Sequence, residues 1–383
     1  MRGFRDRTAI AGVGYTPFSR DSGVSTLTLA ARAIRAALDD AGLTVADVDA
    51  LATHRVGDSV PPWVVAPALG VPAVTWYLDQ FGGGSVSHSV VAQAAMAVAA
   101  GVARTVVCYR AVNARSETRM GRAQGAAFDV QYQAPYGYFA PPQQFAMAAR
   151  AHMNAYGTTH EQLGRIAVRQ RAHAAKNERA LKREPITLDE YLASRWIAEP
   201  LRLLDCCLET DGACAVVVTS RERARDLRRP PVLISGAAWG GGDSLFSGAG
   251  SAPGRATDLT VTEAARLAPR LYAMAGAGPE DIDVAELYDC FTYSVLVQLE
   301  DYGFCVKGEG GAYVESGGLP VNTHGGFLSE GYVHGINHIA EAVAQLRGTA
   351  GDRQVPGAEV ALSTAQPGYV LAGTSALVLR SGR

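Results

Sequence analysis

The feature that most constrains the fold of this chain is an internal duplication. The stretch AARAIRAALDDAGLTVADVDAL in the first half returns as AARLAPRLYAMAGAGPEDIDVAEL in the second. The shared residues keep one offset of 234 positions, as in Gly42 and Gly276 or Asp49 and Asp283 (276 minus 42, 283 minus 49). Each copy has the pattern of a helix closed by a glycine, a short acidic turn and a strand. The chain is therefore expected to contain two related halves.

A second pair of stretches repeats in the same order. FGGGSVSHSVVAQAAMAVAAG ends at Gly101, and GGFLSEGYVHGINHIAEAVAQLRG ends at Gly348. Each is a glycine-rich turn that leads into a helix with an apolar stripe and a closing glycine. Aligning the closing glycines places Gly84-Ser85 opposite Gly331-Tyr332. Two helix N-termini are thus expected to face one pocket, with free backbone N–H groups pointing into it.

Strand-like segments follow both of these helices: RTVVCYRAV in the first half, and EVALST and SALVLR in the second. Strands that alternate with helices are typical of parallel sheets covered by helices. We expect an α/β fold in which two duplicated βαβ halves form a five-layered αβαβα arrangement. The halves are expected at residues 1–225 and 226–383, with a lid-like subdomain inserted at about 112–200.

Charge and cysteine content narrow the possible partners and the compartment. The formal net charge of -2 gives no reason to expect binding to nucleic acid or to a membrane surface. The cysteines show no CxxC pair and are expected to be reduced thiols in a cytoplasmic protein without a signal peptide. The most apolar stretch, VVAQAAMAVAAGVARTVVCY, is interrupted by Gln93, Gly101 and Arg104, which favours a buried helix followed by a buried strand.

Three further motifs follow one another along the chain. LLDCCLETDGACAVVVTS ends the first half, YDCF occupies 288–291, and GGFLSEGYVHG occupies 325–335. With the duplication, these motifs resemble the thiolase superfamily over nearly the whole chain. In thiolases the second motif is Asn-Glu-x-Phe or His-Asp-x-Phe, and the third contains Gly-His-Pro. Both catalytic histidine positions are tyrosines in this chain, Tyr288 and Tyr332.

The catalytic cysteines of thiolases are missing as well. The position of the nucleophile reads Gly83-Gly84-Ser85, and the position of the second cysteine lies in AQPGYVLAG, residues 365–373. No acyl-enzyme can form at either position. The resemblance therefore does not extend to Claisen condensation or to thiolytic cleavage.

One branch of the superfamily fits these departures. The lipid-transfer-protein-like aldolases of actinobacterial steroid catabolism are similar in lacking the cysteines and in carrying a tyrosine in each motif. The resemblance implies retro-aldol cleavage of a steroid side-chain CoA thioester, of the 17-hydroxy-3-oxo-4-pregnene-20-carboxyl-CoA type, to a 17-ketosteroid and propionyl-CoA. No cofactor is implied, because the CoA thioester is itself the substrate. The resemblance also implies a homodimer, with the strand near Val106 and Cys108 close to the interface. A complex with an OB-fold and zinc-ribbon-like domain of the preceding hydratase is implied in addition.

Retro-aldol chemistry suits a pair of tyrosines. The β-hydroxyl must lose a proton and the resulting enolate must gain one, and a phenol can do either. We predict Tyr288 and Tyr332 as the acid–base pair, with Tyr332 favoured as the base. An ordinary phenol has a pKa near ~10, so Tyr332 would need nearby donors or the positive end of the helix that follows it. Either tyrosine could instead pack at the edge of the core.

The remaining candidates are polar or glycine residues near these motifs. Asp289 is expected to orient a tyrosine or to bond neighbouring backbone, and His334 to line the pocket or to cap the helix. Backbone N–H groups that could stabilise the enolate are predicted at Gly84, Ser85, Gly325, Gly326 and Gly331. Arg115 and Arg119 could bind the CoA phosphates, or they could be solvated loop charges or interface residues. A metal site is not expected, because the histidine spacing matches no zinc motif.

Two other functions remain open at this stage. The chain could be a non-catalytic protein that binds an acyl-CoA or a sterol, although two phenols in the catalytic positions argue against it. It could also be a thiolase-type acyltransferase that uses Cys290, and such an enzyme would form a covalent acyl-enzyme. We interpret Cys290 as a buried packing thiol, since nothing in the sequence indicates a lowered pKa.

Overall fold

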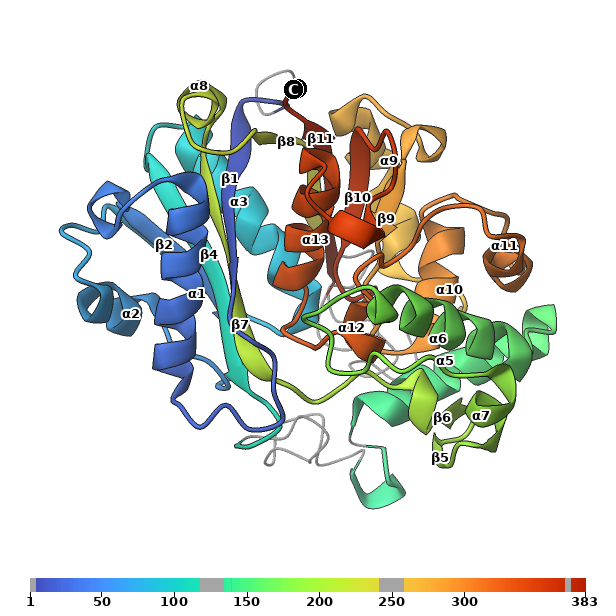
Figure 1. Ribbon diagram of the computed structural model, residues 1–383. Helices are drawn as coiled ribbons and strands as arrows, with labels where there is room; N and C mark the ends of the chain where they lie inside the picture. Colours follow the sequence, from blue (N-terminus) through green and yellow to red (C-terminus); the bar gives the residue numbers. More distant parts are fainter. Residues whose placement is uncertain (1–4, 118–133, 139, 241–257, 369–372) are drawn as a thin grey trace.

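The computed structural model describes residues 5–117, 134–138, 140–240, 258–368 and 373–383 (Figure 1). Its strands are β1 (Thr8–Tyr15), β2 (Ala50–Arg55), β3 (Trp76–Phe81), β4 (Thr105–Asn113), β5 (Trp196–Ala198), β6 (Leu201–Arg202), β7 (Asp211–Ser220), β8 (Val232–Gly240), β9 (Val284–Glu286), β10 (Val360–Thr364) and β11 (Thr374–Ser381). Its helices are α1 (Thr26–Ala41), α2 (Pro62–Leu69), α3 (Ser87–Ala99), α5 (Pro141–Tyr156), α6 (His160–Ala175), α7 (Leu188–Ala193), α8 (Arg221–Arg225), α9 (Glu263–Ala275), α10 (Thr292–Asp301), α11 (Gly310–Ser316), α12 (Gly326–Ser329) and α13 (Ile336–Arg347).

The duplication is visible in the order of the strands. Nine strands form one sheet in the order β3-β2-β4-β7-β1-β8-β11-β10-β9. Outward from the junction of β1 and β8, the first half runs β1, β7, β4, β2 and the second runs β8, β11, β10, β9. A parallel bridge between Ala285 and Val321 stands where β3 pairs with β2 in the first half. The two halves therefore match strand for strand. The boundary between them near residue 225 stays a prediction.

The expectation of parallel sheets is only partly correct. Parallel pairing holds for β2 with β3, β2 with β4, and β9 with β10. The other pairs in this sheet are antiparallel. The connection from β10 to β11 spans 365–373, which is shorter than the dozen or so residues that a parallel crossover needs. These two strands are therefore restricted to a hairpin.

The predicted five layers are confirmed. Helix α1 packs on the outer face of the first half of the sheet, and α9 packs on the outer face of the second half (Figure 1). Helices α3 and α13 lie side by side between the two halves (Figure 1). Their apolar side chains, such as Val91 and Ile339, share one core with inward-facing residues of both halves, such as Val216 and Leu377. The central layer thus brings the two glycine-rich turns to the same end of the molecule.

The duplicated helices begin and end as the sequence predicts. Ser25 and Thr262 act as N-caps, since each side chain accepts a hydrogen bond from a backbone N–H of the first turn. Gly42 and Gly276 close the helices with φ values of 73° and 59°. Glycine adopts this left-handed conformation without the steric penalty that other residues incur.

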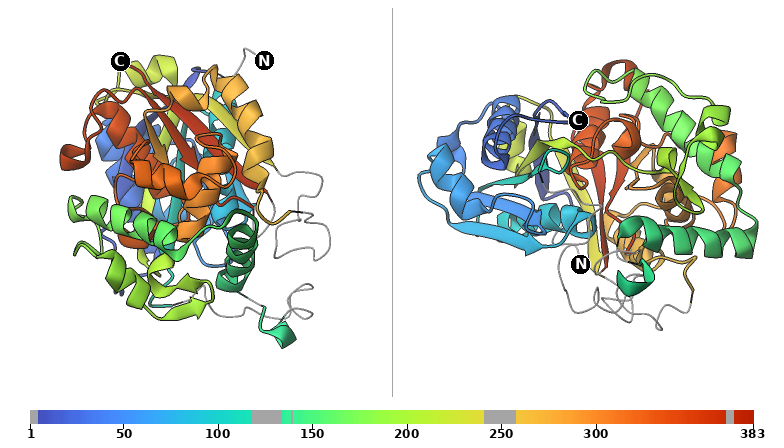
Figure 2. Two further views of the ribbon diagram at one scale, coloured as in Figure 1. Left: turned by 90° about the vertical axis from the view of Figure 1, so that its right-hand side faces the viewer. Right: turned by 90° about the horizontal axis from the view of Figure 1, so that it is seen from below.

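The insert starts in the first half and packs against the second. Helix α6 lies against α10, α11 and α12 of the second half, and α5, α7 and the β5–β6 hairpin complete the subdomain (Figure 2). Phe145, Leu163 and Tyr191 are fully buried in the same apolar cluster as Tyr288 and Tyr332. The described part of the insert therefore shares the apolar core of the second half.

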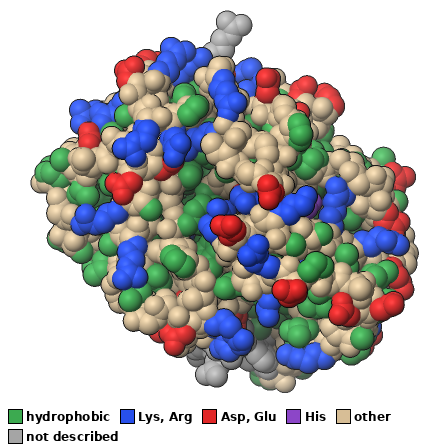
Figure 3. All heavy atoms as spheres, viewed as in Figure 1, with side chains coloured by type: hydrophobic (Ala, Val, Ile, Leu, Met, Phe, Trp, Pro, Cys, Tyr) green, Lys and Arg blue, Asp and Glu red, His purple; other side chains and the backbone are tan. Residues whose placement is uncertain are grey.

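Several further expectations can be compared with the structure. The apolar stretch around Gln93 forms the buried helix α3 and the buried strand β4, as predicted. All six cysteines are free thiols. No described helix combines the length and apolarity needed to cross a bilayer. On the face seen in Figure 3, basic and acidic side chains are interspersed rather than gathered by sign.

Candidate active site

The two predicted tyrosines meet in the interior. Tyr288 follows β9, and Tyr332 lies in the turn between α12 and α13. Their hydroxyl oxygens are 2.5 Å apart, a short hydrogen bond. Tyr288 is 1% exposed and Tyr332 is 9% exposed. Residues 44 positions apart in sequence thus form one phenol pair, shielded from bulk water.

The turn of the first half completes this pair. A Cβ atom placed on Gly84 would lie 1.7 Å from the hydroxyl oxygen of Tyr288 and 2.1 Å from its Cζ. No side chain fits in that space while the phenol is present. The space beside Gly84, within the stretch Gly83-Gly84-Ser85, is therefore filled by the Tyr288 hydroxyl, which explains why glycine stands at position 84.

Phe327 fixes the orientation of both phenols. The Phe327 ring makes T-shaped contacts with the rings of Tyr288 and Tyr332. The centroid distance is 4.8 Å in each case, and the interplanar angles are 80° and 68°. On its other side, Phe327 stacks on His338 at 4.0 Å with an interplanar angle of 9°. Contacts of this kind favour one packing geometry of aromatic rings. Phe327 was not predicted from the sequence.

Asp289 holds the turn that carries Phe327. Its carboxylate accepts hydrogen bonds from the backbone N–H groups of Phe327 and Leu328, at 2.9 and 3.2 Å, and lies 3.1 Å from Nε2 of His338. A Cβ on Gly326 would lie 2.0 Å from this carboxylate, so a glycine is required there. Among its described contacts, none reaches a tyrosine hydroxyl. The structure therefore favours the backbone-bonding role that the sequence left open for Asp289.

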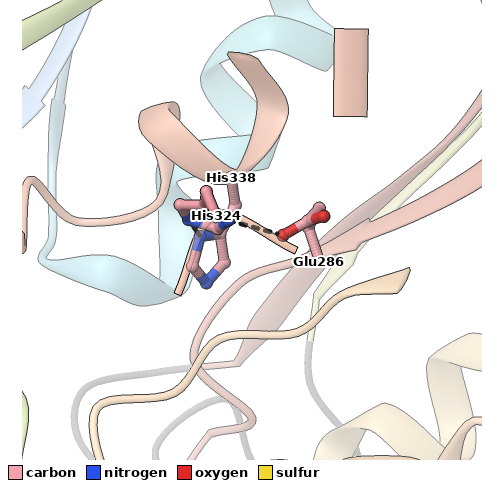
Figure 4. A group of neighbouring side chains, drawn as sticks. All are labelled: Glu286, His324 and His338. Carbon is pink, nitrogen blue, oxygen red and sulfur yellow. Dashed lines mark hydrogen bonds and ion pairs between the residues drawn. The ribbon is translucent and has the colours of Figure 1, made fainter. Parts of the chain in front are cut away.

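A row of buried titratable side chains supports the turn that carries Phe327. His324 lies between Glu286 and His338 (Figure 4), with its Nδ1 2.9 Å from Glu286 Oε2 and its Nε2 3.1 Å from His338 Nδ1. The contact with Glu286 has ion-pair distance but not hydrogen-bond alignment. Burial alone would lower the pKa of His324, but Glu330, Glu286 and Glu341 outweigh it and raise the pKa to about 9. His324 is therefore an imidazolium at neutral pH.

The same three side chains have the composition of a metal site. Glu286, His324 and His338 bring potential ligand atoms to within 4.8 Å of one another. However, His338 Nε2 already lies 3.0 Å from the Leu287 carbonyl oxygen and 3.1 Å from Asp289, and His324 Nδ1 lies 2.9 Å from Glu286 Oε2. We interpret the group as an ion-paired support for the turn.

The electrostatic environment of the tyrosines differs from the expectation. Burial raises the pKa of both phenols well above the ordinary value, and the nearby Cys207 and Cys290 thiols add to the effect. The helix that follows Tyr332 begins only at Ile336, and the Tyr332 N–H donates to Thr210 Oγ1 at 3.1 Å. Burial therefore raises the pKa of Tyr332, and the role of Tyr332 as the base stays a prediction. Both phenols are neutral at physiological pH.

His334 lines the site, and an unpredicted arginine holds it. Its ring centroid lies 4.7 Å from that of Tyr332. Its Nδ1 accepts hydrogen bonds from Nε and Nη2 of Arg110, at 3.2 and 2.9 Å. Arg110 is completely buried in β4, a strand otherwise made mostly of apolar residues. One charged residue inside an apolar strand pattern was the available signal, because such a residue needs a partner.

The predicted residues Gly325, Gly331 and Ser85 make contacts of different kinds. Gly325 has a φ of 99° and lies so close to Ala174 of α6 that a Cβ would approach it to 2.5 Å. Gly331 packs on Phe18, and the Ser85 carbonyl accepts a hydrogen bond from Ser375 at 2.7 Å. Close packing therefore explains why glycine stands at positions 325 and 331.

Of the two predicted arginines, the structure describes only Arg115. The backbone N–H of Arg115 donates to Asp211 at 2.8 Å, and no described contact links its side chain to the tyrosines. Arg119 lies outside the described residues, as do residues 369–372 of the segment that corresponds to the second thiolase cysteine.

Cys290 has the environment of a packing thiol. Burial raises its pKa well above the ordinary value, and the adjacent Asp289 carboxylate adds to the rise. Its sulfur lies 3.9 Å from the Ser294 hydroxyl. A thiol becomes a good nucleophile when its pKa is lowered, so this environment disfavours a nucleophilic role.

Comparison with known proteins connects these features to a family. The family model described as "Thiolase C-terminal domain-like" matches residues 250–381. The chain is 44% identical over 382 residues to the 17-hydroxy-3-oxo-4-pregnene-20-carboxyl-CoA lyase of Mycobacterium tuberculosis, covering 96% of this chain and 98% of that protein. It is 46% identical over 357 residues to the steroid side-chain-cleaving aldolase of Thermomonospora curvata, covering 89% and 90%. The solved structure named Ltp2-ChsH2(DUF35) aldolase superposes with a TM-score of 0.93 and 45% identity, covering 100% of this chain and 99% of that one.

Proposed function

Because the chain belongs to the thiolase-like superfamily, and within it to the steroid side-chain-cleaving aldolases, we propose that it is a carbon–carbon lyase acting on a steroid acyl-CoA. The substrate is of the 17-hydroxy-3-oxo-4-pregnene-20-carboxyl-CoA type. The products are a 17-ketosteroid and propionyl-CoA. The observation that carries this function is the hydrogen-bonded pair of Tyr288 and Tyr332, which fills the space beside Gly84.

The reaction needs proton transfers but no covalent enzyme intermediate. The tertiary hydroxyl loses its proton as its oxygen becomes the ketone. The bond between the ring carbon and the side-chain carbon breaks, and its electron pair moves into the thioester to form an enolate. The enolate carbon then takes up a proton and becomes propionyl-CoA. The thioester itself is the electron sink, so a glycine at position 84 is compatible with this reaction.

The phenol pair can carry out both transfers without a stable tyrosinate. With both pKa values raised, a free phenolate is disfavoured at neutral pH. In the 2.5 Å pair, one phenol can accept the substrate proton while it passes its own proton to the other. In the same step the second phenol gives its own proton to the enolate carbon, so that neither oxygen carries two protons and both phenols end neutral. We retain Tyr332, the more exposed of the two, as the one that receives the hydroxyl proton.

A partner subunit is part of the proposal. The name of the superposed structure combines an aldolase with a DUF35 component. We propose that this chain also works with a DUF35-type partner, the OB-fold and zinc-ribbon domain of the preceding hydratase. Copurification of the two chains, and a comparison of turnover with and without the partner, test this part.

A homodimer through β3 is also proposed. Val106 and Cys108 are completely buried in β4, between β2 and β7, and the interface expected near them stays a prediction. The free edge of the first half is β3, where Phe81 is 75% exposed and Tyr77 packs on Trp63 at a centroid distance of 6.2 Å. An uncovered edge strand with exposed aromatics favours pairing with a second copy. Analytical ultracentrifugation of the wild type and of Phe81→Lys tests it.

The acyltransferase alternative receives no support from Cys290, because the pKa of its thiol is raised. The binding-protein alternative predicts that substrate binds and stays intact.

One assay separates these functions. Purified protein, with and without its partner, is incubated with 17-hydroxy-3-oxo-4-pregnene-20-carboxyl-CoA, and the products are identified by mass spectrometry. We expect propionyl-CoA and the 17-ketosteroid from the wild type, and a loss of at least about 100-fold in Tyr332→Phe. Intact substrate with every preparation would support the binding protein. A protein mass increased by the acyl group would support the acyltransferase.

A further inference from the structure

We infer that Arg110, paired with Asp58, holds His334 as a permanent hydrogen-bond donor to the oxygen of the thioester enolate. This inference rests on the proposed function and assigns the group that stabilises the negative charge during cleavage. Arg110 is in this account a positioning residue, because it acts through His334. The two phenols transfer protons, and His334 stabilises the negative charge of the enolate.

The tautomer of His334 follows from its contact with Arg110. A guanidinium can only donate, so Nδ1 of His334 must accept, at 2.9 and 3.2 Å from Nη2 and Nε. A neutral imidazole with Nδ1 as acceptor carries its proton on Nε2. Burial and the adjacent cation of Arg110 lower the pKa of His334 to about 3. The ring therefore remains neutral and donates through Nε2 across the physiological pH range.

Arg110 is itself fixed on three sides. Its Nη1 donates to the backbone carbonyl of His54 at 2.8 Å, and its Nη2 donates to Asp58 Oδ2 at 2.5 Å. Burial would raise the pKa of Asp58, but the Arg110 guanidinium outweighs it and holds the pKa well below the usual range. The ion pair is therefore intact across the physiological pH range. Breaking a buried pair by removing one partner is strongly unfavourable, so the position of the guanidinium is well defined.

The Nε2 side of His334 faces the turn that holds the phenol pair. A Cβ on Gly83 would lie 3.8 Å from Nε2 and from Cδ2 of His334. The next residue, Gly84, is the one that touches the hydroxyl of Tyr288. No hydrogen-bond partner of Nε2 is found in the part of the chain that the structure describes. An N–H donor thus stands beside the two phenols without a described acceptor, which is the arrangement that a developing oxyanion requires.

The backbone conformation of His334 is consistent with a fixed position of its ring. His334 has a φ of 55°, in the left-handed region that residues other than glycine adopt infrequently. Such a conformation is energetically unfavourable and persists where the surroundings impose it. The bonds from Arg110 to the ring and the neighbouring Gly335, with a φ of 103°, impose it here. The strain places the imidazole over Gly83.

The chemical role follows from the electron movement. When the carbon–carbon bond breaks, its electron pair becomes the enolate, and the negative charge concentrates on the thioester oxygen. A donor already in place stabilises this charge without reorganisation, and the loss of one such donor typically lowers kcat by about 100- to 1000-fold. Because Arg110 occupies Nδ1, His334 cannot remove a proton from the substrate.

Three variants and one spectroscopic measurement test the inference. His334→Gly deletes the donor and suits the left-handed backbone, so the variant is expected to fold. We expect its kcat to fall by about 100- to 1000-fold, and free imidazole to restore part of it. His334→Gln keeps an N–H donor and should retain kcat within about tenfold of the wild type. His160→Gln, at the partly exposed start of α6, is the matched control and should behave as the wild type.

The positioning role of Arg110 has its own readout. Nitrogen NMR of histidine-labelled wild type should show His334 neutral, with its proton on Nε2, from pH 5 to pH 8. The charged groups around the ring are Arg110 and Asp58, and His54 and Tyr332 are its titratable neighbours. In Arg110→Met/Asp58→Asn, which removes both charges together, the proton of His334 should no longer be confined to Nε2, and kcat should fall with little change in KM.

The outcomes separate the inference from the proposed function. No propionyl-CoA from the wild type would overturn the lyase function. Product formation by the wild type, with kcat of His334→Gly within about threefold of it, would overturn only the donor role. An imidazolium, or a proton on Nδ1, in the wild-type spectrum would overturn the positioning by Arg110, whatever the activity. Thermal unfolding of each variant establishes that the compared proteins are folded.

Discussion

Replacement of Gly84 by alanine tests whether the first half of the fold holds the phenol pair in place. The new Cβ would lie 1.7 Å from Oη, 2.1 Å from Cζ and 2.5 Å from Cε2 of Tyr288. Ordinary contacts between such atoms begin near 3.4 Å, so the ring must move by about 1.5 Å or the turn must open. Either change breaks the 2.5 Å bond to Tyr332.

The expected size of the effect follows from this displacement. A shift of about 1 Å in a reacting group can lower the rate by about 100-fold, so we expect at least that loss in kcat for propionyl-CoA release. Overpacking of this kind costs about 1 to 3 kcal/mol in the free energy of unfolding. Urea unfolding followed by circular dichroism measures the second quantity. Gly70→Ala is the control, because Gly70 has a φ of 78° and open space around it, so it should lose stability but not activity.

A double variant sharpens the test. In Tyr288→Ala the atoms that Gly84→Ala would meet are gone, so adding Gly84→Ala should cost almost no further stability. The coupling energy of the cycle should then equal the loss of about 1 to 3 kcal/mol seen in the wild-type background. Additive losses, or a folded Gly84→Ala variant with kcat within tenfold of the wild type, would refute the account of why glycine stands at this position.

Three further predictions concern the groups around the pair. Asp289→Asn replaces an acceptor of two backbone N–H groups and of His338, and should lower the free energy of unfolding by about 1 to 3 kcal/mol; an unchanged urea midpoint would contradict the role of Asp289 in the turn. His324 has a folded pKa of about 9 against an ordinary value of 6.5, so its imidazolium stabilises the fold fully below pH 6.5 and this contribution disappears as the pH rises through 9. Wild-type stability should therefore fall by up to about 3 kcal/mol between these pH values, and the fall should be absent in His324→Gln. Cys290→Ala should keep kcat within about threefold, and a larger loss accompanied by an acyl adduct in the wild type would revive the acyltransferase.

Much of the fold could be predicted because the duplicated segments repeat the same local sequence signals. Gly42 and Gly276 end helices for the same conformational reason in both halves, and the constant offset shows that the two halves keep one register. The five layers follow from the helix–strand alternation. Strand direction is predicted incorrectly by the alternation of helices and strands, which indicates parallel sheets, whereas the short connection between β10 and β11 already indicates a hairpin.

The phenol pair could be predicted because each tyrosine stands in a motif of known order. The support around it could not. Arg110 is separated from His334 by 224 positions, and only the packing of β4 beside the third motif brings them together. The pKa of Tyr332 depends on its burial, which no local pattern reveals. A sequence shows which groups are able to carry a proton, whereas the surrounding packing decides whether they are charged.

The most direct test of the central claim is a single-turnover reaction in deuterium oxide, with the wild type and its DUF35-type partner, analysed by mass spectrometry of the CoA product and of the intact protein. Retro-aldol cleavage through the Tyr288–Tyr332 pair predicts propionyl-CoA with one deuterium on the carbon next to the thioester, together with an unmodified protein. Propionyl-CoA without deuterium at that carbon, or a protein that carries an acyl group, would contradict proton transfer by two neutral phenols.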